Sequence, residues 1–408
     1  MSVRVGAVLL VLLTCAGGVR AQDVVLRGQG EPPRGEVVRV DRAGVVVRPI
    51  AEAGTDPAVA PAEVIVPLDR VRTVLGARRG EWDALEPLAS ALWRAQTRID
   101  RDDVVGAQVV IERWGEKFAE LSGPSAAAAA RLELRLALQV ELPGSGVRAA
   151  QAWARALDAA DSAREGPRWF VPASDLTEGM IDAATGLSPV VPPFWLDTPA
   201  TRAALESVER SAPTLGARAG ALREWFLLAA KIDLGQKVTL PALPEPVEPA
   251  LALVADLVRA RSDDGAQRAE ARARLESRLI RKPAEWERAW IWLGLGRSLL
   301  REGEREQKLR GVGYLLRVPA SGGWANLAAI ARADAAVALA ALNLPREAGV
   351  VKGELERDDA LGSALALAVP ALRPIVALSR PAATNVETPQ TAEETSEAQE
   401  RKSPEAPR

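Results

Sequence analysis

Neighbouring carboxylates are the residues of this chain whose types and spacing most readily suggest chemistry. Paired carboxylates can transfer protons or bind a metal ion. Each group lies where a helix is expected to begin, and acidic side chains stabilise helix N-termini through capping and the helix dipole. We therefore interpret the carboxylates as helix caps. The groups are Asp100 with Asp102 and Asp103, Asp263 with Asp264, and Asp358 with Asp359.

Other catalytic and cofactor-binding signatures are missing from the sequence. It contains no histidine, and its single cysteine, Cys15, lies near the N-terminus, so histidine-dependent triads and His–Cys zinc sites are excluded. Gly294 to Gly296 and Gly311 to Gly313 lack the third glycine of a dinucleotide-binding fingerprint, and no phosphate-binding loop is present. We predict no catalytic residue, no cofactor and no metal ligand, and hence no enzyme.

The eleven tryptophans are compatible with carbohydrate stacking or with core packing. Five recur at helical spacing in apolar stripes and are expected in the core: Trp93, Trp114, Trp153, Trp225 and Trp290. Two further aromatic pairs flank a proline-rich segment. Their side chains either pin that segment onto the helices or line a binding groove, where aromatic anchors dominate affinity. The candidate partner-binding residues are Trp169, Phe170, Phe194 and Trp195.

The composition indicates a folded and nearly neutral chain. Of its 408 residues, 48% are hydrophobic, which suffices for a substantial core in two or three domains or in one solenoid. The formal net charge is -2, and the basic residues are spread along the chain. A nucleic-acid-binding protein needs a surplus of basic groups to displace counterions from phosphates. We therefore exclude nucleic acid as a partner.

The N-terminus has the features of a bacterial export signal. Arg4 precedes an apolar run from Val5 to Leu13, and Val19-Arg20-Ala21 has small residues where a signal peptidase cleaves. Residues 1–21 are thus predicted to be a signal peptide, and the protein to be exported to the periplasm or cell envelope, or secreted. Two alternatives are lipidation of Cys15 and retention of the run as an anchor. No later segment is long and apolar enough to span a membrane.

Residues 22–78 differ from the rest of the chain and are predicted to form a small β module. β-Branched residues bounded by turn formers, as in Gly35 to Asp41 and Val45 to Ile50, indicate strands. The short link between these two runs suits a hairpin. The spacing of the strands resembles that of small barrels of the SH3-like or Sm-like kind.

From Trp82 onward the apolar period becomes helical, and the fold class is predicted to be mainly α. Prolines interrupt the helices twice, although Leu176 to Ala184 is still predicted as a short helix. The end of the chain has little to bury and is expected to be disordered. The predicted divisions are helical hairpins (79–165), a proline-rich insertion (166–199), a hairpin with a proline-rich connector (200–247), a second helical block (248–378) and a disordered tail (379–408).

Within the second block, Trp290 to Gly294 reads Trp-Ile-Trp-Leu-Gly and matches the opening of a tetratricopeptide repeat. Equivalent positions of a second copy are occupied by Leu327, Ile330 and Ala331, and Gly311 corresponds to Ala348 in the partner helices. The pattern resembles a tetratricopeptide-like α-solenoid, although Arg297 stands where that family usually has an aromatic residue. The resemblance implies a scaffold whose concave face binds a protein or peptide.

These observations favour a non-catalytic exported scaffold, or protein-protein interaction module, of the bacterial cell envelope. Such a scaffold should have a concave face lined by mixed charged and apolar side chains. The alternative is a glycan- or cell-wall-binding envelope protein, in which Trp169 and Trp195 are exposed and coplanar in one groove. An enzyme built on carboxylates alone is a third hypothesis, and it requires two acids that converge in a pocket, at least one of them buried.

Overall fold

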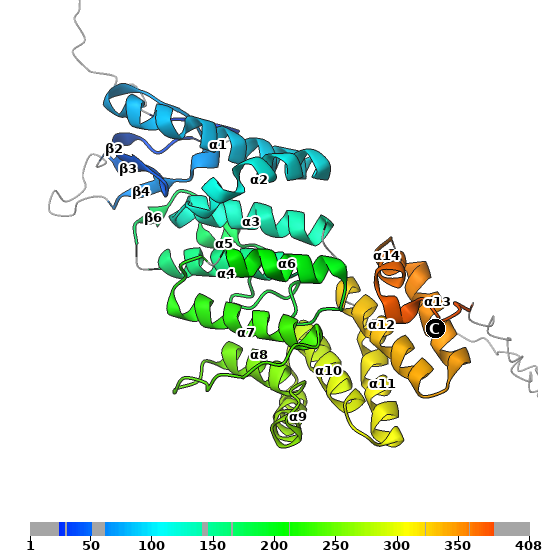
Figure 1. The fold of residues 1–408 in the computed structure, drawn as a ribbon. Helices are drawn as coiled ribbons and strands as arrows, with labels where there is room; N and C mark the ends of the chain where they lie inside the picture. Colours follow the sequence, from blue (N-terminus) through cyan, green and yellow to red (C-terminus); the bar gives the residue numbers. More distant parts are fainter. Residues whose placement is uncertain are drawn as a thin grey trace, which may run out of the picture.

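The fold is mainly helical, with fourteen helices and a small N-terminal β module in the described residues (Figure 1). None of these helices is long and apolar enough to cross a membrane. The predicted signal peptide (1–21), with Cys15, and the predicted disordered tail (379–408) lie outside the described residues. The structure is a computed structural model that describes residues 24–28, 31–50, 62–140, 146–164, 166–211, 213–322, 324–358 and 360–378.

The β module contains the two strands predicted above, three further strands from residues 22–78 and one from the proline-rich insertion. β1 pairs with β5, and the other four strands form a sheet of order β2-β3-β4-β6 in which β6 runs parallel to β4. The sheet therefore extends beyond the predicted module boundary at residue 78 and includes a strand from the insertion. The resemblance to a small barrel stays a prediction. The strands are β1 (Val24–Leu26), β2 (Gly35–Asp41), β3 (Gly44–Pro49), β4 (Val64–Val66), β5 (Val71–Val74) and β6 (Arg168–Trp169).

Four helices follow the β module, namely α1 (Arg79–Asp100), α2 (Val104–Ala119), α3 (Gly123–Val140) and α4 (Val147–Ser162). The apolar face of α1 buries Trp82 and Leu92, as the helical period predicts. Asp103 caps α2 by accepting a hydrogen bond from the backbone nitrogen of Gly106 at 2.9 Å. Asp100 is the last residue of α1, so the prediction that it caps a helix N-terminus is wrong.

The turn between β2 and β3 attaches α3 to the β module. Ser125, near the start of α3, donates its hydroxyl to the Ala43 carbonyl at 2.7 Å and accepts from the backbone nitrogen of Leu68 at 3.0 Å. Gly44 is required at this turn, because its φ is 145° and a Cβ there would lie 2.2 Å from the Val66 carbonyl oxygen. One end of α3 is thereby held against the sheet.

The predicted helix from Leu176 to Ala184 is wrong, because α5 (Ala173–Leu176) ends where that helix should begin. The carboxylate of Asp182 instead accepts hydrogen bonds from the backbone nitrogen and the hydroxyl of Thr185, at 2.9 and 2.7 Å. Gly186 then adopts a left-handed φ of 74°. Such local side-chain bonds offer the backbone an alternative to the helix and favour a turn.

Nine further helices run from the end of the insertion to the end of the described chain. Asp264 caps α9 by accepting from the backbone nitrogens of Ala266 and Gln267 at 2.9 and 3.2 Å, whereas Asp358 is the last residue of α13 and does not lie at the start of a helix as predicted. The helices are α6 (Pro199–Arg210), α7 (Ala217–Asp233), α8 (Pro249–Arg259), α9 (Gly265–Ile280), α10 (Glu285–Leu300), α11 (Arg305–Ala320), α12 (Ala325–Ala341), α13 (Pro345–Asp358) and α14 (Ala360–Ala368).

The helices contact mainly their neighbours in sequence. They form a bent row that runs from α1 to α9 and returns along α10 to α14 (Figure 1). In the region that resembles repeats, Trp290 and Ala348 are fully buried. α10 and α11 approach closely because glycine faces glycine: a Cβ on Gly296 would lie 3.0 Å from the Gly311 carbonyl oxygen. The relation to tetratricopeptide repeats stays a prediction.

Candidate functional site

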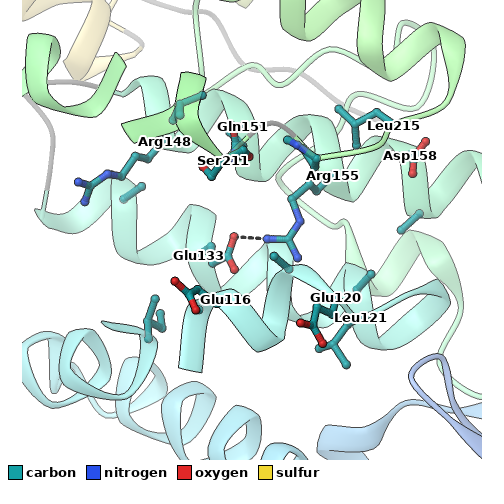
Figure 2. Close-up of a pocket in the computed structure, with 18 of the residues that line it drawn as sticks. Glu116, Glu120, Leu121, Glu133, Arg148, Gln151, Arg155, Asp158, Ser211 and Leu215 are labelled. Atoms are coloured by element: carbon teal, nitrogen blue, oxygen red, sulfur yellow. Dashed lines mark hydrogen bonds and ion pairs between the residues drawn. The ribbon is translucent and has the colours of Figure 1, made fainter. Parts of the chain in front are cut away.

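An open groove of about 940 Å³ lies between the first hairpins of the helical row (Figure 2). Side chains of α2 and α3 line one side, and α4 with the end of α6 lines the other. The apolar part of the lining includes Ile111, Leu121, Leu136, Val208 and Leu215. The rest of the lining is charged or polar, so the groove combines apolar contact surface with charged groups.

Carboxylates outnumber cations along the groove. The lining contains Glu112, Glu116, Glu120, Glu133 and Asp158, against the two arginines Arg148 and Arg155. Three of the glutamates recur every fourth residue along α2 and its C-cap, so they face the same side of that helix, about 6 Å apart along its axis. Figure 2 shows Glu116 and Glu120 on the side of the groove opposite α4.

Arg155 lies at the centre of the groove and connects its two sides. Its side chain is only 8% exposed. It donates to Glu133 Oε2 at 2.5 Å and to the Phe118 carbonyl at 2.8 Å, so α4 is fastened to both α3 and α2. Glu133 neutralises the positive charge of Arg155. The carboxylates on α2 therefore dominate the electrostatics of that side of the groove.

Hydrogen bonds also hold the side of the groove formed by α4 and α6. Gln151 donates to the Ser211 carbonyl at 3.3 Å, and Arg223 donates to the Gln151 side-chain oxygen at 3.1 Å. Asp158 accepts a hydrogen bond from the backbone nitrogen of Gly216 at 2.7 Å. These bonds tie α4 to the segment between α6 and α7, so the groove has a defined shape without a bound partner.

A second cavity, of about 560 Å³, is lined by seven charged side chains, four of which we call the Arg–Asp network: Asp233, Arg261, Arg297 and Asp334. Asp233 Oδ2 accepts from Arg261 Nη1 at 3.0 Å, from Arg297 Nη1 at 2.9 Å and from the backbone nitrogen of Trp195 at 2.9 Å. Arg297 Nε also donates to Asp334 Oδ2 at 2.5 Å. The network joins α7, α10 and α12 to Arg261, which lies two residues beyond the end of α8.

The arginines of the network also hold the backbone of the proline-rich insertion. Arg261 donates to the Pro193 carbonyl and Arg297 to the Trp195 carbonyl, each at 2.9 Å. The ring of Phe194 lies beneath both guanidinium groups, at 4.6 and 5.6 Å from its centroid. The end of the insertion is thus fixed to the centre of the helical row.

Burial changes the proton affinity of the network. It lowers the pKa of Arg261 to about 10, because a guanidinium removed from water loses its hydration. Arg261 nevertheless stays protonated near neutral pH. Burial also raises the pKa of Asp334 above its ordinary value, an effect that the nearby Arg297 opposes. Near neutral pH the network holds two guanidinium cations, and Asp233, with three donors on one oxygen, is their central counter-ion.

The structure separates the two aromatic pairs that the sequence singled out. Trp169 belongs to β6 and to the apolar core of the β module and first helices, whereas Phe194 and Trp195 belong to the core of the later helices. All three side chains are buried, and Phe170 is half-buried. These contacts agree with the interpretation that the aromatic residues pin the insertion onto the helices.

Neither the groove nor the network was identified from the sequence. The signal for the groove was present in the four-residue spacing of Glu112, Glu116 and Glu120. Arg297 was visible only as a departure from the repeat pattern. Nothing in the sequence links it to Asp233, which lies on a helix far away in the chain.

Comparisons with protein-family models, with curated proteins and with solved structures found no match to this chain. No set of three Asp, Glu, Cys or His side chains in the described part of the chain is placed to hold a metal ion. The groove and the Arg–Asp network are therefore the features of this chain that bear on its function.

Proposed function

We propose that this protein is a non-catalytic scaffold that binds a segment of a partner protein in the groove between α2, α3, α4 and α6. The observation that carries the proposal is the lining of the groove, which mixes apolar side chains with exposed charges on rigid helices. Helical frameworks of this kind present preformed surfaces to peptides. Export to the periplasm or cell envelope, which the predicted signal peptide implies, is part of the same proposal.

The arrangement of the helices supports a tetratricopeptide-like solenoid as the framework of this scaffold. In a solenoid, each structural unit contacts only its neighbours, and the stack of units creates an extended binding surface. The described helices contact mainly their sequence neighbours, and they bend into a row (Figure 1). The groove opens on one part of this row, where three consecutive helices and α6 meet.

A carboxylate-based enzyme is a weaker explanation of the second cavity. Asp233 and Asp334 both point to Arg297, and Asp233 is buried. The same oxygen of Asp233 accepts three hydrogen bonds, two of them from guanidinium groups. A carboxylate engaged in this way serves as a counter-ion and is poorly placed to accept a proton from a substrate.

A glycan-binding groove built on the insertion requires Trp169 and Trp195 to be exposed and coplanar. Both side chains are buried, at 7% and 4% exposure, in two different apolar clusters. A sugar ring stacks on an accessible aromatic face, and these faces are covered by protein. We therefore place the partner in the groove, and we assign these aromatic residues to the core.

Filling the groove tests the proposal. Ala119 is exposed and lines the groove, so Ala119→Trp introduces a large ring there. Val105, also on α2, is 75% exposed and does not line the groove, so Val105→Trp is the matched control. The wild-type protein and both variants, each expressed with its own N-terminus, are used to capture proteins from envelope extract, and mass spectrometry identifies and quantifies what is retained.

We expect the wild type and Val105→Trp to retain one defined partner. Ala119→Trp should retain at least about tenfold less of that partner, which corresponds to about 1.4 kcal/mol of binding free energy. Equal capture by all three proteins would overturn the assignment of the groove. Unfolding temperatures of the three proteins, measured in parallel, establish that the variants are folded.

A further inference from the structure

The charge of the groove restricts the chemistry of its occupant. Glu112 accepts a hydrogen bond from Gln108 at 2.8 Å, and Glu120 pairs with Arg42 at 2.6 Å on the protein surface. Among the described residues, no lysine or arginine forms an ion pair with Glu112 or Glu116. These two carboxylates are exposed, and their negative charge is left to water and to whatever enters the groove.

The cations that line the groove do not balance this charge. Arg155 is already paired with Glu133, and in Figure 2 the guanidinium of Arg148 points toward one end of the groove, away from Glu116 and Glu120. An anionic segment would therefore meet the carboxylates of α2 without a free cation beside them. Like charges at close distance disfavour such a partner.

We infer that the groove binds an extended, cationic segment of a partner protein, in which lysine or arginine alternates with aliphatic residues. This inference rests on the proposed function. Glutamates four residues apart on α2 lie about 6 Å apart along the helix axis. Alternate side chains of an extended chain lie about 6.6 Å apart on one face, so basic residues at every second position match Glu112 and Glu116. The intervening aliphatic side chains face the opposite side, where the half-buried Pro213 and Leu215 provide apolar surface.

A synthetic peptide tests this charge and spacing directly. The probe is a fluorescein-labelled peptide of about twelve residues that alternates lysine with valine, which as an extended chain of about 40 Å is longer than α2, at about 24 Å. A second peptide carries glutamate in place of every lysine. Fluorescence anisotropy measures the binding of both peptides to the full chain, to Glu112→Gln/Glu116→Gln, and to Ala119→Trp.

The matched control for the double variant is Glu178→Gln/Glu224→Gln. It removes two exposed carboxylates, and the same net charge, at positions that do not line the groove. Non-specific attraction between the peptide and an acidic protein would weaken equally in both double variants. Specific recognition would weaken only in the variant of the groove.

We expect the lysine peptide to bind the wild type and the control double variant, and to bind Glu112→Gln/Glu116→Gln and Ala119→Trp at least about tenfold more weakly. Its affinity should fall as the ionic strength rises. Binding of the glutamate peptide as tight as that of the lysine peptide, or equal loss in both double variants, would overturn the inference.

If the lysine peptide does not bind while Ala119→Trp still abolishes capture of the natural partner, the cationic class is wrong and the groove remains the binding site. Failure of both experiments rejects the proposed function as well.

Discussion

The groove and the Arg–Asp network both gather charged side chains from several helices, but they treat those charges in opposite ways. In the network, Arg261 and Asp233 are 1% and 5% exposed, and each charge has an opposite partner. In the groove, Glu112 and Glu116 are exposed and form no ion pair with any described residue. A buried charge is expensive unless it is paired, whereas an exposed charge costs little and stays available. We therefore regard the network as structural and the groove as the binding site.

The network is placed where it can hold distant parts of the chain together. It joins α7, α10 and α12, and its arginines bind the Pro193 and Trp195 carbonyls of the insertion. Removing one member would leave its partners buried and uncompensated. Removing Glu112 or Glu116 of the groove would leave no such partner among the described residues. Four variants test this difference, in order of decreasing expected effect on stability.

Asp233→Ala should have the largest effect. It leaves Arg261 and Arg297 buried with less counter-charge and removes the acceptor of the Trp195 backbone nitrogen. We expect the free energy of unfolding to fall by about 3–5 kcal/mol, the range observed when one partner of a buried ion pair is removed. Urea unfolding followed by circular dichroism measures it. A loss below about 1 kcal/mol would contradict a structural role for the network.

Phe194→Leu should have the next largest effect. The ring lies beneath the guanidinium groups of Arg261 and Arg297, and leucine keeps apolar volume but offers no aromatic face. We expect a loss of about 2 kcal/mol, from weaker cation–π attraction and imperfect packing. The same urea titration measures it. The matched control is Phe226→Leu, which removes a buried ring that lies over no guanidinium group of the described residues; an equal loss there would show that packing alone explains the effect.

Asp69 separates burial from pairing, because it is buried but poorly paired. Its Oδ1 has no hydrogen-bond partner in the described structure, and Arg70 Nε lies 3.9 Å from Oδ2. Burial raises the pKa of this carboxyl above its ordinary value of 3.8, and Arg70 offsets only part of that effect. An acid whose pKa is raised by folding holds its proton more tightly in the folded state. Its ionised form therefore destabilises the fold as the pH rises through the raised pKa.

Asp69→Asn should accordingly stabilise the protein by about 1 kcal/mol at neutral pH, which is opposite in sign to Asp233→Ala. The gain should shrink as the pH falls through the raised pKa toward 3.8, since the wild-type carboxyl is then protonated. Urea unfolding of both proteins at a series of pH values measures the difference. A variant that is less stable than the wild type at neutral pH would show that the Asp69 carboxylate is paired more strongly than its contacts indicate.

Glu112→Gln/Glu116→Gln should have the smallest effect on stability. Both side chains are exposed and bind no described cation, so the free energy of unfolding should change by less than about 0.5 kcal/mol. Binding of the lysine peptide should nevertheless weaken strongly. A change in stability comparable to that of Asp233→Ala would mean that the groove carboxylates are structural, and the contrast between the two regions would disappear.

Local sequence patterns predicted the elements of the fold well. The range Gly35 to Asp41 is a strand with the predicted bounds, and the mainly helical class is confirmed. Patterns failed where side chains competed with the backbone, as Asp182 does in the insertion. They also failed at Trp93, which was expected in the core but is 40% exposed, with the guanidinium of Arg27 over its ring. Helical periodicity cannot reveal which strand or loop covers the end of an apolar stripe.

The sites were harder to predict than the elements because they depend on tertiary arrangement. The members of the Arg–Asp network come from segments far apart in the sequence, and no period relates Asp233 to Arg297 or Asp334. The spacing of Glu112 and Glu116 showed that they share a helix face. It did not show that α4 and α6 stand opposite them, because helix packing sets that arrangement.

Photo-crosslinking from inside the groove shows whether a partner binds there. A photoreactive benzoyl-phenylalanine replaces Thr214, which is exposed and lines the groove, or Val105, which is exposed on α2 outside it. Both variants are expressed in the native host, and cells are irradiated before mass spectrometry of the adducts. We predict an adduct with one partner, through a lysine- or arginine-rich segment, from position 214 and not from position 105. No protein adduct from position 214, or the same adducts from both positions, would contradict it.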